Sequence, residues 1–325
     1  MAVRAPTVVD LVTMRTTFAP LLGVMALAAL LATSADASAF CRSTTCRSTA
    51  SKECATDENS CPTDGAKLLW PSSCISYAMN VNGTQDLDPV ETRATIRKCF
   101  QAWAEVPCPG GGNASMTFEE REPAACKKSQ YNKDGANLNV VLFQDDDWNY
   151  RGIDGTLAKT SVTYNDQTGE IYDADIEVNA ANNTVTISND PKIIDYDLQA
   201  VLTHEVGHFI GIAHSPDPSA VMFASYAPGS ISQRVLTPDD VGAVCEIYPP
   251  KSGVVCNSTP RGGYSATCPD APKSTGCMVA ATSSPSPSEG TSSSESPASF
   301  ALFGFGLLAM ARLARPSNRT KGPTR

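Results

Sequence analysis

Three histidines and one glutamate are spaced so that they could hold a metal ion beside a general base. His204 and His208 are four positions apart, so on a helix their imidazoles lie one above the other on a single face, with Glu205 beside them. Two such imidazoles can bind Zn²⁺ while the carboxylate takes a proton from water. The pattern indicates metal-assisted hydrolysis, although a bare HExxH also fits a pair of surface histidines without a metal.

A third imidazole lies within reach of the same point. Gly211 is expected to end the helix, because a residue without Cβ can take the positive φ that reverses the chain. His214 then returns toward His204 and His208, and these are all the histidines that the chain contains. A zinc site with three protein ligands keeps its fourth position open for water, as catalytic sites do.

The extended pattern HExxHxxGxxH, followed by a methionine, resembles the metzincin signature. Ser215, directly after the third histidine, is similar to the matrixin branch of that family. The resemblance implies a zinc endopeptidase in which Glu205 is the catalytic base. It also implies that Met222, eight residues after His214, forms the Met-turn, an apolar floor beneath the imidazoles.

The resemblance also points to the residues that would contact a substrate. Tyr226 and residues 227–231 stand where matrixins build the wall of the pocket for the residue after the scissile bond. Ala224 replaces the proline usual there, which leaves the shape of the pocket open. In matrixins the edge strand of the sheet binds substrate as an added antiparallel strand, and residues 156–163 are the corresponding stretch here.

The resemblance covers residues 67–250 and implies an α+β metzincin, or zincin, fold. We expect a mixed, twisted sheet of about five strands, two covering helices, an active-site helix, and a small C-terminal subdomain that contains the Met-turn and a last helix. Alternating apolar residues predict a first strand with one buried face. The predicted strands are Ile75–Met79, Ser115–Glu120, Leu138–Phe143, Ala158–Tyr164 and Ile171–Val178.

Residues typical of helix N-termini predict where the helices of this fold begin. Asp88 and Pro89 open a helix whose apolar residues, among them Trp103, recur at helical spacing. Asp195 or Asp197 caps the helix that carries the histidines. A last helix begins at Thr237 with a capping residue, a proline and two acids, and it ends near Ile247 and Tyr248.

Two acidic clusters could bind calcium through carboxylate oxygens, although the sequence favours solvated turns as their explanation. The clusters are Asp145, Asp146, Asp147 and Asp154, and then Asp166, Asp173 and Asp175. The family's animal members hold a second, structural zinc with three further histidines and an aspartate. This chain has no other histidine, and no cysteine lies between Cys126 and Cys245. We therefore expect one zinc per chain, the catalytic one.

The first residues are typical of an export signal. Arg15 precedes an apolar run at residues 21–32, and Ala37-Ser38-Ala39 fits the small-x-small cleavage rule, so residues 1–39 would be removed. The run is too short to span a bilayer. Translation could also start at Met14, and a buried N-terminal helix is the alternative interpretation. An exported chain would be secreted to the extracellular space or held at the cell surface.

Twelve cysteines follow this segment, and in an exported chain they predict disulfides. None has the CxxC spacing of a zinc ribbon, and the pairing cannot be deduced from one sequence. Residues 40–66 carry four of them with few apolar residues, which indicates a small disulfide-stapled segment. The alternative is an inhibitory prosegment whose free thiolate occupies the zinc, but no Pro-Arg-Cys-Gly type motif is present.

The C-terminal part lies beyond the family resemblance. Residues 251–278 form a cysteine-containing extension of unknown role, and residues 279–297 form a Ser/Pro-rich linker with no capacity for a core. Residues 298–325 are apolar and then basic, an order that resembles the sorting tails of bacterial surface proteins. Such a tail would associate with a membrane or surface transiently, and an ordinary disordered tail is the alternative.

Composition limits the function classes. The net charge of −9 and the absence of a basic patch from the central region argue against binding nucleic acid through its phosphates. The sequence favours an enzyme that acts on proteins or peptides and leaves its oligomeric state open. Two rival classes are a binding module on an inactive metzincin scaffold and a structural zinc protein. Glu205 argues against both, because neither has a use for a base beside the metal.

Overall fold

The computed structural model describes residues 39–48, 52–148, 150, 156–252, 256–268 and 311–312. The predicted export signal apart from Ala39, the Ser/Pro-rich linker, and the predicted sorting tail apart from residues 311–312 lie outside this part of the chain. None of the helices among these residues combines the length and the apolar composition that spanning a bilayer requires.

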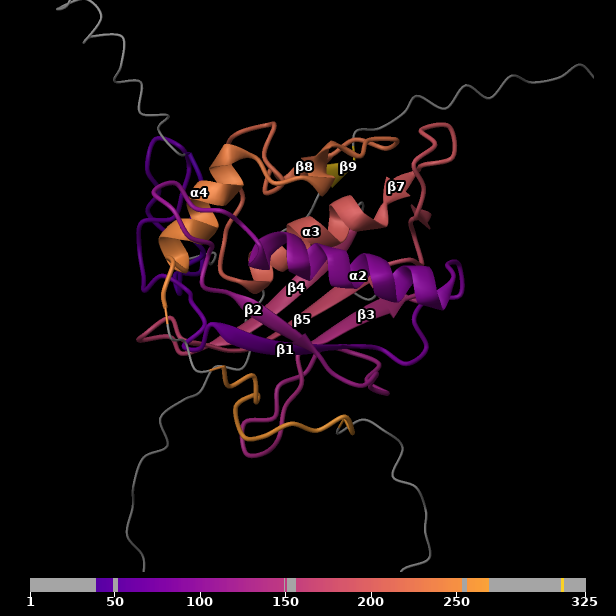
Figure 1. Cartoon of the computed structure of the whole chain (residues 1–325), viewed down its shortest axis with the longest axis horizontal. Coiled ribbons are helices and arrows are strands. Elements are labelled where there is room, and N and C mark those ends of the chain that lie inside the picture. The colour runs from indigo at the N-terminus through magenta and orange to yellow at the C-terminus, as the bar shows by residue number, and fades with distance from the viewer. Residues whose placement is uncertain are drawn as a thin grey trace, which may run out of the picture. The chain divides into compact units, whose positions relative to one another are not determined.

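A mixed five-stranded sheet carries the fold, as the sequence predicts (Figure 1). The strand order is β2-β1-β3-β5-β4; the first four strands in that order run parallel, and β4 runs antiparallel to β5 at the edge. The predicted substrate-binding stretch therefore lies on an edge strand. The strands are β1 (Cys74–Met79), β2 (Thr117–Glu120), β3 (Val140–Gln144), β4 (Ala158–Tyr164) and β5 (Ile171–Asn179).

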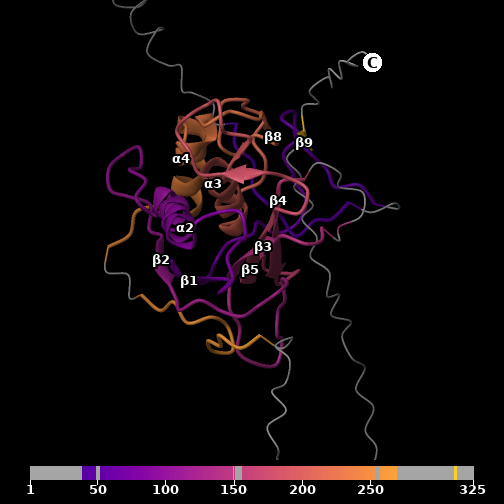
Figure 2. The same cartoon turned by 90° about the vertical axis from the view of Figure 1, so that its right-hand side faces the viewer.

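Two helices, α2 (Pro89–Ala104) and α3 (Leu198–Phe209), lie on one face of this sheet (Figures 1 and 2). The active-site helix α3 is thus itself one of the two covering helices. The Asp88 side chain caps α2 by accepting from the main-chain N–H groups of Val90 and Glu91, each at 2.9 Å. Where the helices meet, the Trp103 indole N–H donates to the Thr203 carbonyl at 2.8 Å. Trp103 is fully buried, so it belongs to the core as predicted.

The remaining elements follow α3 or flank it. Helix α4 (Pro238–Ile247) begins after the predicted capping residue Thr237, and a 3₁₀ turn, η1 (Ser232–Arg234), precedes it. The short strands are β6 (Val185–Thr186), β7 (Tyr196–Asp197), β8 (Ser225–Tyr226) and β9 (Ala311–Arg312); β6 pairs with β7, and β8 pairs with β9.

Strand β1 is buried on both faces, so the prediction of one buried face was wrong. Ile75, Tyr77 and Met79 join the main core beneath the helices. On the opposite face, Ser76 and Ala78 are also buried, at 1% and 0% exposure. The alternation of apolar and polar residues was read correctly, but a segment distant in sequence covers the polar side.

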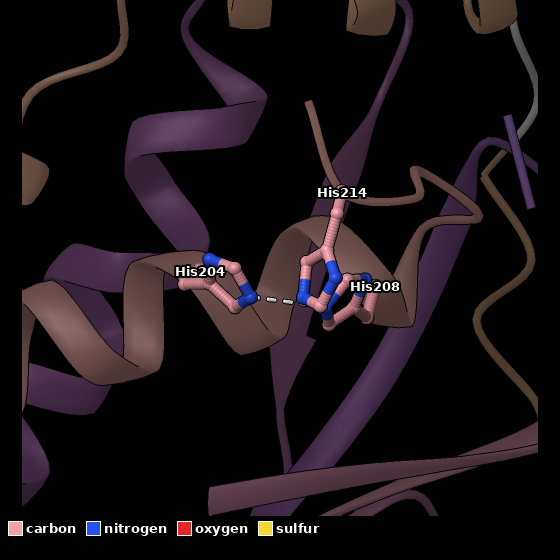
Figure 3. Close-up of side chains that lie close together, drawn as sticks. All are labelled: His204, His208 and His214. Carbon is pink, nitrogen blue, oxygen red and sulfur yellow. Dashed lines mark hydrogen bonds between the residues drawn. The ribbon is translucent and has the colours of Figure 1, made fainter. Parts of the chain in front are cut away.

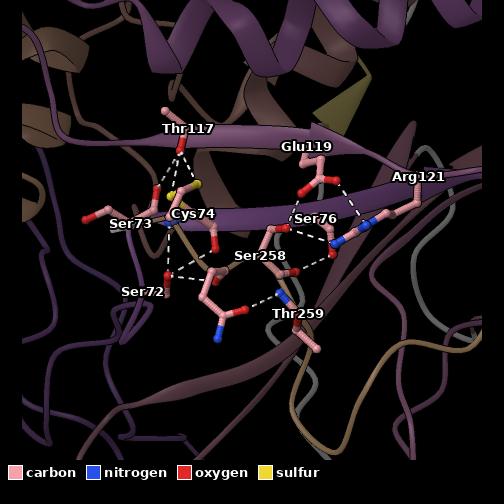
Figure 4. Close-up of a disulfide and its surroundings, with 11 residues drawn as sticks. Ser72, Ser73, Cys74, Ser76, Thr117, Glu119, Arg121, Ser258 and Thr259 are labelled. Atoms are coloured by element: carbon pink, nitrogen blue, oxygen red, sulfur yellow. Dashed lines mark hydrogen bonds and ion pairs between the residues drawn. A yellow bond between two sulfur atoms is a disulfide. The ribbon is translucent and has the colours of Figure 1, made fainter. Parts of the chain in front are cut away.

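Residues 256–268 of the extension are that cover, and they run across the sheet on the face away from the helices (Figures 1 and 4). Two disulfides fasten the segment at its ends, Cys74–Cys256 and Cys126–Cys268. Between them, the Ser76 hydroxyl donates to the Ser258 carbonyl at 2.7 Å. The extension is therefore part of the folded unit rather than a separate appendage.

Three further disulfides are Cys41–Cys61, Cys46–Cys54 and Cys108–Cys245. The N-terminal segment is stapled as predicted, and its four cysteines are all paired, so none offers the free thiolate of the prosegment alternative. Cys99 is an exception to the predicted pairing, because it is a free cysteine. This thiol is buried between α2 and α3, and burial raises its pKa to about 12. Cys277 lies outside the described residues.

The acidic clusters are only partly the solvated turns that the sequence suggested. Asp146, Asp147 and Asp166 are exposed, whereas Asp173 and Asp175 are buried on β5, on the face away from the helices. The Asp175 carboxylate accepts from the main-chain N–H groups of Val140 and Gln130 at 2.8 and 2.9 Å. Burial raises the pKa of Asp175 to about 8 and that of Asp173 well above its ordinary value.

A buried ammonium group lies beside this acidic face. The Lys159 side chain is 3% exposed, its Nζ atom lies 4.0 Å from Glu177 Oε2, and it stands 3.8 Å from the ring centre of Tyr150. Glu177 is itself 1% exposed. Desolvation lowers the pKa of Lys159, and the carboxylates of Glu177 and Asp175 oppose that shift. Lys159 thus places a positive charge among the buried acidic side chains of β5.

Replacing Lys159 with Met should destabilise the fold strongly. The substitution keeps the apolar stem but leaves the Glu177 charge buried without its cation, a loss that is about 3 kcal/mol or more for buried pairs. Adding Glu177→Gln should recover part of the lost stability, because it removes the uncompensated charge. Urea unfolding at neutral pH measures both, with exposed Lys192→Met as the matched control. A Lys159→Met variant as stable as the control would contradict a structural role for this ammonium.

Candidate metal centre

Helix α3 begins and ends in ways that fix its histidines. The Asp197 carboxylate caps it by accepting from the Ala200 N–H at 3.0 Å, which selects Asp197 from the two predicted caps. Arg234 pairs with the same carboxylate, with its Nε atom 2.8 Å from Oδ2. At the other end Gly211 has φ +93°, the predicted positive value. A Cβ there would lie 2.7 Å from the Leu68 carbonyl oxygen, so the turn also needs glycine for space.

The three imidazoles converge, as Figure 3 shows. Their ring centres are 4.7 Å (His204–His208), 5.2 Å (His204–His214) and 4.9 Å (His208–His214) apart. One nitrogen from each ring lies within 4.8 Å of the others. Among the described residues, no other group of three or more His, Cys, Asp or Glu side chains brings its potential metal-binding atoms this close together.

Main-chain carbonyls fix the tautomers of the two helical histidines. His204 Nδ1 lies 2.7 Å from the Val221 oxygen, and His208 Nδ1 lies 2.8 Å from the Ile212 oxygen. A carbonyl only accepts, so each Nδ1 carries the proton and each Nε2 carries a lone pair. Burial lowers the pKa of His204 to about 3 and that of His214 to about 4, and it also lowers that of His208. All three rings are therefore neutral at pH 7.

This arrangement fits a metal cation. The two Nε2 atoms of His204 and His208 face each other at 3.0 Å with no proton to share. His214 Nε2 is buried and has no hydrogen-bond partner among the described residues. Nitrogens held at 2.0–2.1 Å from a tetrahedral zinc are about 3.3 Å apart. Three converging lone pairs of neutral imidazoles are the donor set that Zn²⁺ prefers.

Glu205 lies beside these rings and is completely buried. Its Oε2 atom accepts from the Thr160 hydroxyl at 2.5 Å, whereas its Oε1 atom has no partner among the described residues. Burial raises the pKa of Glu205 to about 8, and the hydrogen bonds from Thr160 oppose that rise. In its ionised form this carboxylate offers Oε1 as a free proton acceptor, and the raised pKa makes that form more basic than an ordinary carboxylate.

Met222 packs directly under α3. It is fully buried, and a Cβ on Gly207 would collide with its sulfur and lie 3.0 Å from the Trp103 ring. Glycine between the two helical histidines thus lets the methionine approach. The Asp240 carboxylate holds this turn by accepting from the N–H groups of Val221 and Met222 at 2.9 and 3.1 Å.

Tyr226, the residue assigned to the pocket wall, is 1% exposed. Its hydroxyl donates to the Ser230 carbonyl and accepts from the Asp197 N–H at 3.0 Å. The side chain therefore ties residues 226–230 to the start of α3, and its role in a pocket stays a prediction.

Sequence reasoning missed two residues of this site. Thr160 was placed on the edge strand, but nothing in a strand pattern reveals that its hydroxyl meets a carboxylate on a helix. Asp240 was noted only as an acid in the first turn of α4, and its reach to the Met222 turn depends on tertiary packing. The predicted calcium sites are not confirmed.

Comparison with known proteins adds an independent observation. The matrixin family profile matches residues 69–249, which include α3, His214 and Met222. The chain is 25% identical over 185 residues to Metalloendoproteinase 1-MMP of Arabidopsis thaliana and 26% identical over 179 residues to neutrophil collagenase of Homo sapiens. It is 28% identical over 182 residues to matrix metalloproteinase-16 of Homo sapiens.

These matches cover 57%, 55% and 56% of this chain but 45%, 33% and 27% of the respective relatives. The chain therefore spans less than half the length of the relatives it matches. The profile, by contrast, covers more than half of the 325 residues. The α+β fold, the three converging imidazoles and the profile agree, and this chain belongs to the matrixin family of metzincins.

Proposed function

We propose that this chain is a zinc-dependent endopeptidase in which Glu205 is the general base. One observation carries the proposal: three neutral imidazoles converge beside a buried carboxylate that keeps one oxygen free. A structural zinc site would normally recruit a fourth protein ligand, and an inactive scaffold would not need the base. The matrixin relatives, two of them named metalloproteinases, support hydrolysis of proteins or peptides.

His204, His208 and His214 would hold the zinc, which supplies a positive charge that acidifies water and polarises the peptide carbonyl. The main-chain carbonyls of Val221 and Ile212 keep the helical imidazoles in the binding tautomer. Glu205 Oε1 takes the proton of the attacking water and delivers it to the departing amine. Met222 and its Asp240 anchor hold the histidine platform rigid during this transfer.

Substrate would bind along β4. An edge strand leaves main-chain groups free on one side, and an extended peptide can add to it as a further strand. This mode selects for extended main chain, so it fits an endopeptidase that reads few side chains. Residues 226–231, tied to α3 through Tyr226, would form one wall of the neighbouring pocket.

Residues 67–250 would form the catalytic unit, to which the extension is stapled. We further propose that the chain is exported, either secreted or kept at a cell surface. Five disulfides support export, because such bonds persist in oxidising compartments. Transient surface association through residues 298–325 is part of the same proposal.

Glu205→Gln tests the general base. The substitution keeps the side-chain volume but removes the proton acceptor, so peptide hydrolysis should fall about 10²-fold or more. Zinc content should stay unchanged, because Glu205 is not a ligand. A peptide library, incubated with and without a chelator and read by mass spectrometry, supplies the assay, and exposed Glu122→Gln is the control. Near-normal turnover in Glu205→Gln, or chelator-resistant cleavage, would contradict the mechanism.

Metal analysis tests the ligand set. The purified chain should contain one tightly bound zinc, measured by elemental analysis, and chelation should remove zinc and hydrolysis together. His208→Ala should bind zinc at least 10-fold more weakly, because a three-imidazole site loses a ligand. Restoring zinc should restore hydrolysis in the unmodified chain only. Two stoichiometric zincs would show that a second site exists and that the expected count is wrong.

A further inference from the structure

Thr160 connects the edge strand β4 to the candidate base on α3. Its side chain is buried, and its Oγ1 atom lies 2.5 Å from Glu205 Oε2 and 3.1 Å from the Glu205 main-chain oxygen. The contact therefore joins the strand along which a substrate would bind to the carboxylate that would act on it. No sequence motif marks Thr160, and the general-base mechanism stated above does not use it.

The geometry decides where the hydroxyl proton goes. A threonine hydroxyl has one proton, and the shorter contact leads to the carboxylate. A separation of 2.5 Å is typical of a charge-assisted O–H···O⁻ hydrogen bond, which is about twice as strong as a neutral one. In the ionised carboxylate, which is the form in which Glu205 can act as a base, Thr160 therefore donates to Oε2. Oε1, buried and without a partner among the described residues, is the oxygen left to receive another proton.

We propose that Thr160 is a positioning residue for hydrolysis: it holds Glu205 Oε2 so that Oε1 alone faces the reacting water. This inference rests on the function proposed above. It also gives β4 a second task, because the strand that aligns the substrate main chain would set the orientation of the base. The same rigid strand would then hold both the substrate and the base, and a near-attack geometry requires that their relative positions be fixed.

The neighbouring residues of β4 cannot take over this task. Side chains alternate across a strand, so Lys159 and Ser161 point to the opposite face from Thr160. Lys159 accordingly lies beside Glu177 and Tyr150 on the far side of the sheet. Thr203, on α3 itself, donates its hydroxyl to the Gln199 carbonyl.

Three substitutions separate the hydroxyl from the volume of the side chain. Thr160→Val keeps the branched shape and removes the donor, and Thr160→Ser keeps the donor. Thr92→Val makes the same chemical change at a buried threonine of α2, whose hydroxyl donates to the Asp88 carbonyl at 2.8 Å. Thr160→Val should lower kcat about 10-fold with KM within about twofold, because the substrate main chain still binds the strand. Thr160→Ser should stay within about threefold of the unmodified enzyme, and Thr92→Val should do the same.

Zinc content and thermal unfolding show whether each variant is folded. If Thr160→Val does not fold, Thr160→Ala replaces it in the comparison with Thr160→Ser. The proposal is overturned if Thr160→Val keeps kcat within about twofold, or if Thr160→Ser loses as much as Thr160→Val. Equal losses would mean that packing, and not the hydrogen bond, matters at this position.

A double-mutant cycle gives a readout that needs no activity. The unfolding equilibrium constant is measured for Thr160→Val, for Glu205→Ala and for the double variant. Thr160→Val should raise that constant about 10-fold in the presence of Glu205 and by less than about threefold in its absence. Additive effects would overturn the contact itself. Coupled residues in a zinc-loaded chain that cleaves no peptide would instead refute the proposed function, and with it a positioning role for Thr160.

Discussion

The site depends on one constraint: the buried imidazoles of His204 and His208 and the partly buried imidazole of His214 must stay neutral with their lone pairs turned inward. Two main-chain carbonyls impose it, because the Val221 and Ile212 oxygens accept the Nδ1 protons of His204 and His208. Each carbonyl belongs to a turn whose position is fixed elsewhere. Ile212 follows the positive-φ glycine that ends α3, and the Asp240 carboxylate holds the Val221 turn. The last helix thus contributes to the site without supplying a ligand.

The sequence was informative where local rules decide the structure. The i, i+4 histidines, the Asp cap of α3, the glycine at its end and the Pro–Asp start of α4 each depend on a few neighbouring residues, and the structure has all of them. The edge position of β4 also agrees with the family resemblance. Such features follow from the backbone's hydrogen-bonding needs, which short stretches of sequence express directly.

The features that the sequence did not predict, by contrast, each depend on contacts between residues that are distant in sequence. Ser76 looked solvent-facing because nothing near it shows that residues 256–268 cover the far side of β1. Cys99 looked like half of a disulfide, yet the packing of α2 on α3 buries it without a partner thiol. Asp173 and Asp175 lie within the predicted strand, yet they were interpreted as solvated because aspartate is common in turns, and only the packing of the sheet shows that they are buried.

Strand β4 illustrates why the two faces of the sheet cannot be considered separately. Thr160 points toward α3 and contacts the Glu205 carboxylate, while Lys159, the preceding residue, points to the far side and pairs with Glu177. Because side chains alternate, a shift of β4 by one residue would bring the ammonium toward the imidazoles and the threonine toward the buried acids. Both outcomes leave a polar or charged group buried without its partner. The far-side ion pair therefore holds the register on which the catalytic face depends, although the Glu177 carboxylate lies on the opposite side of the sheet from the metal centre.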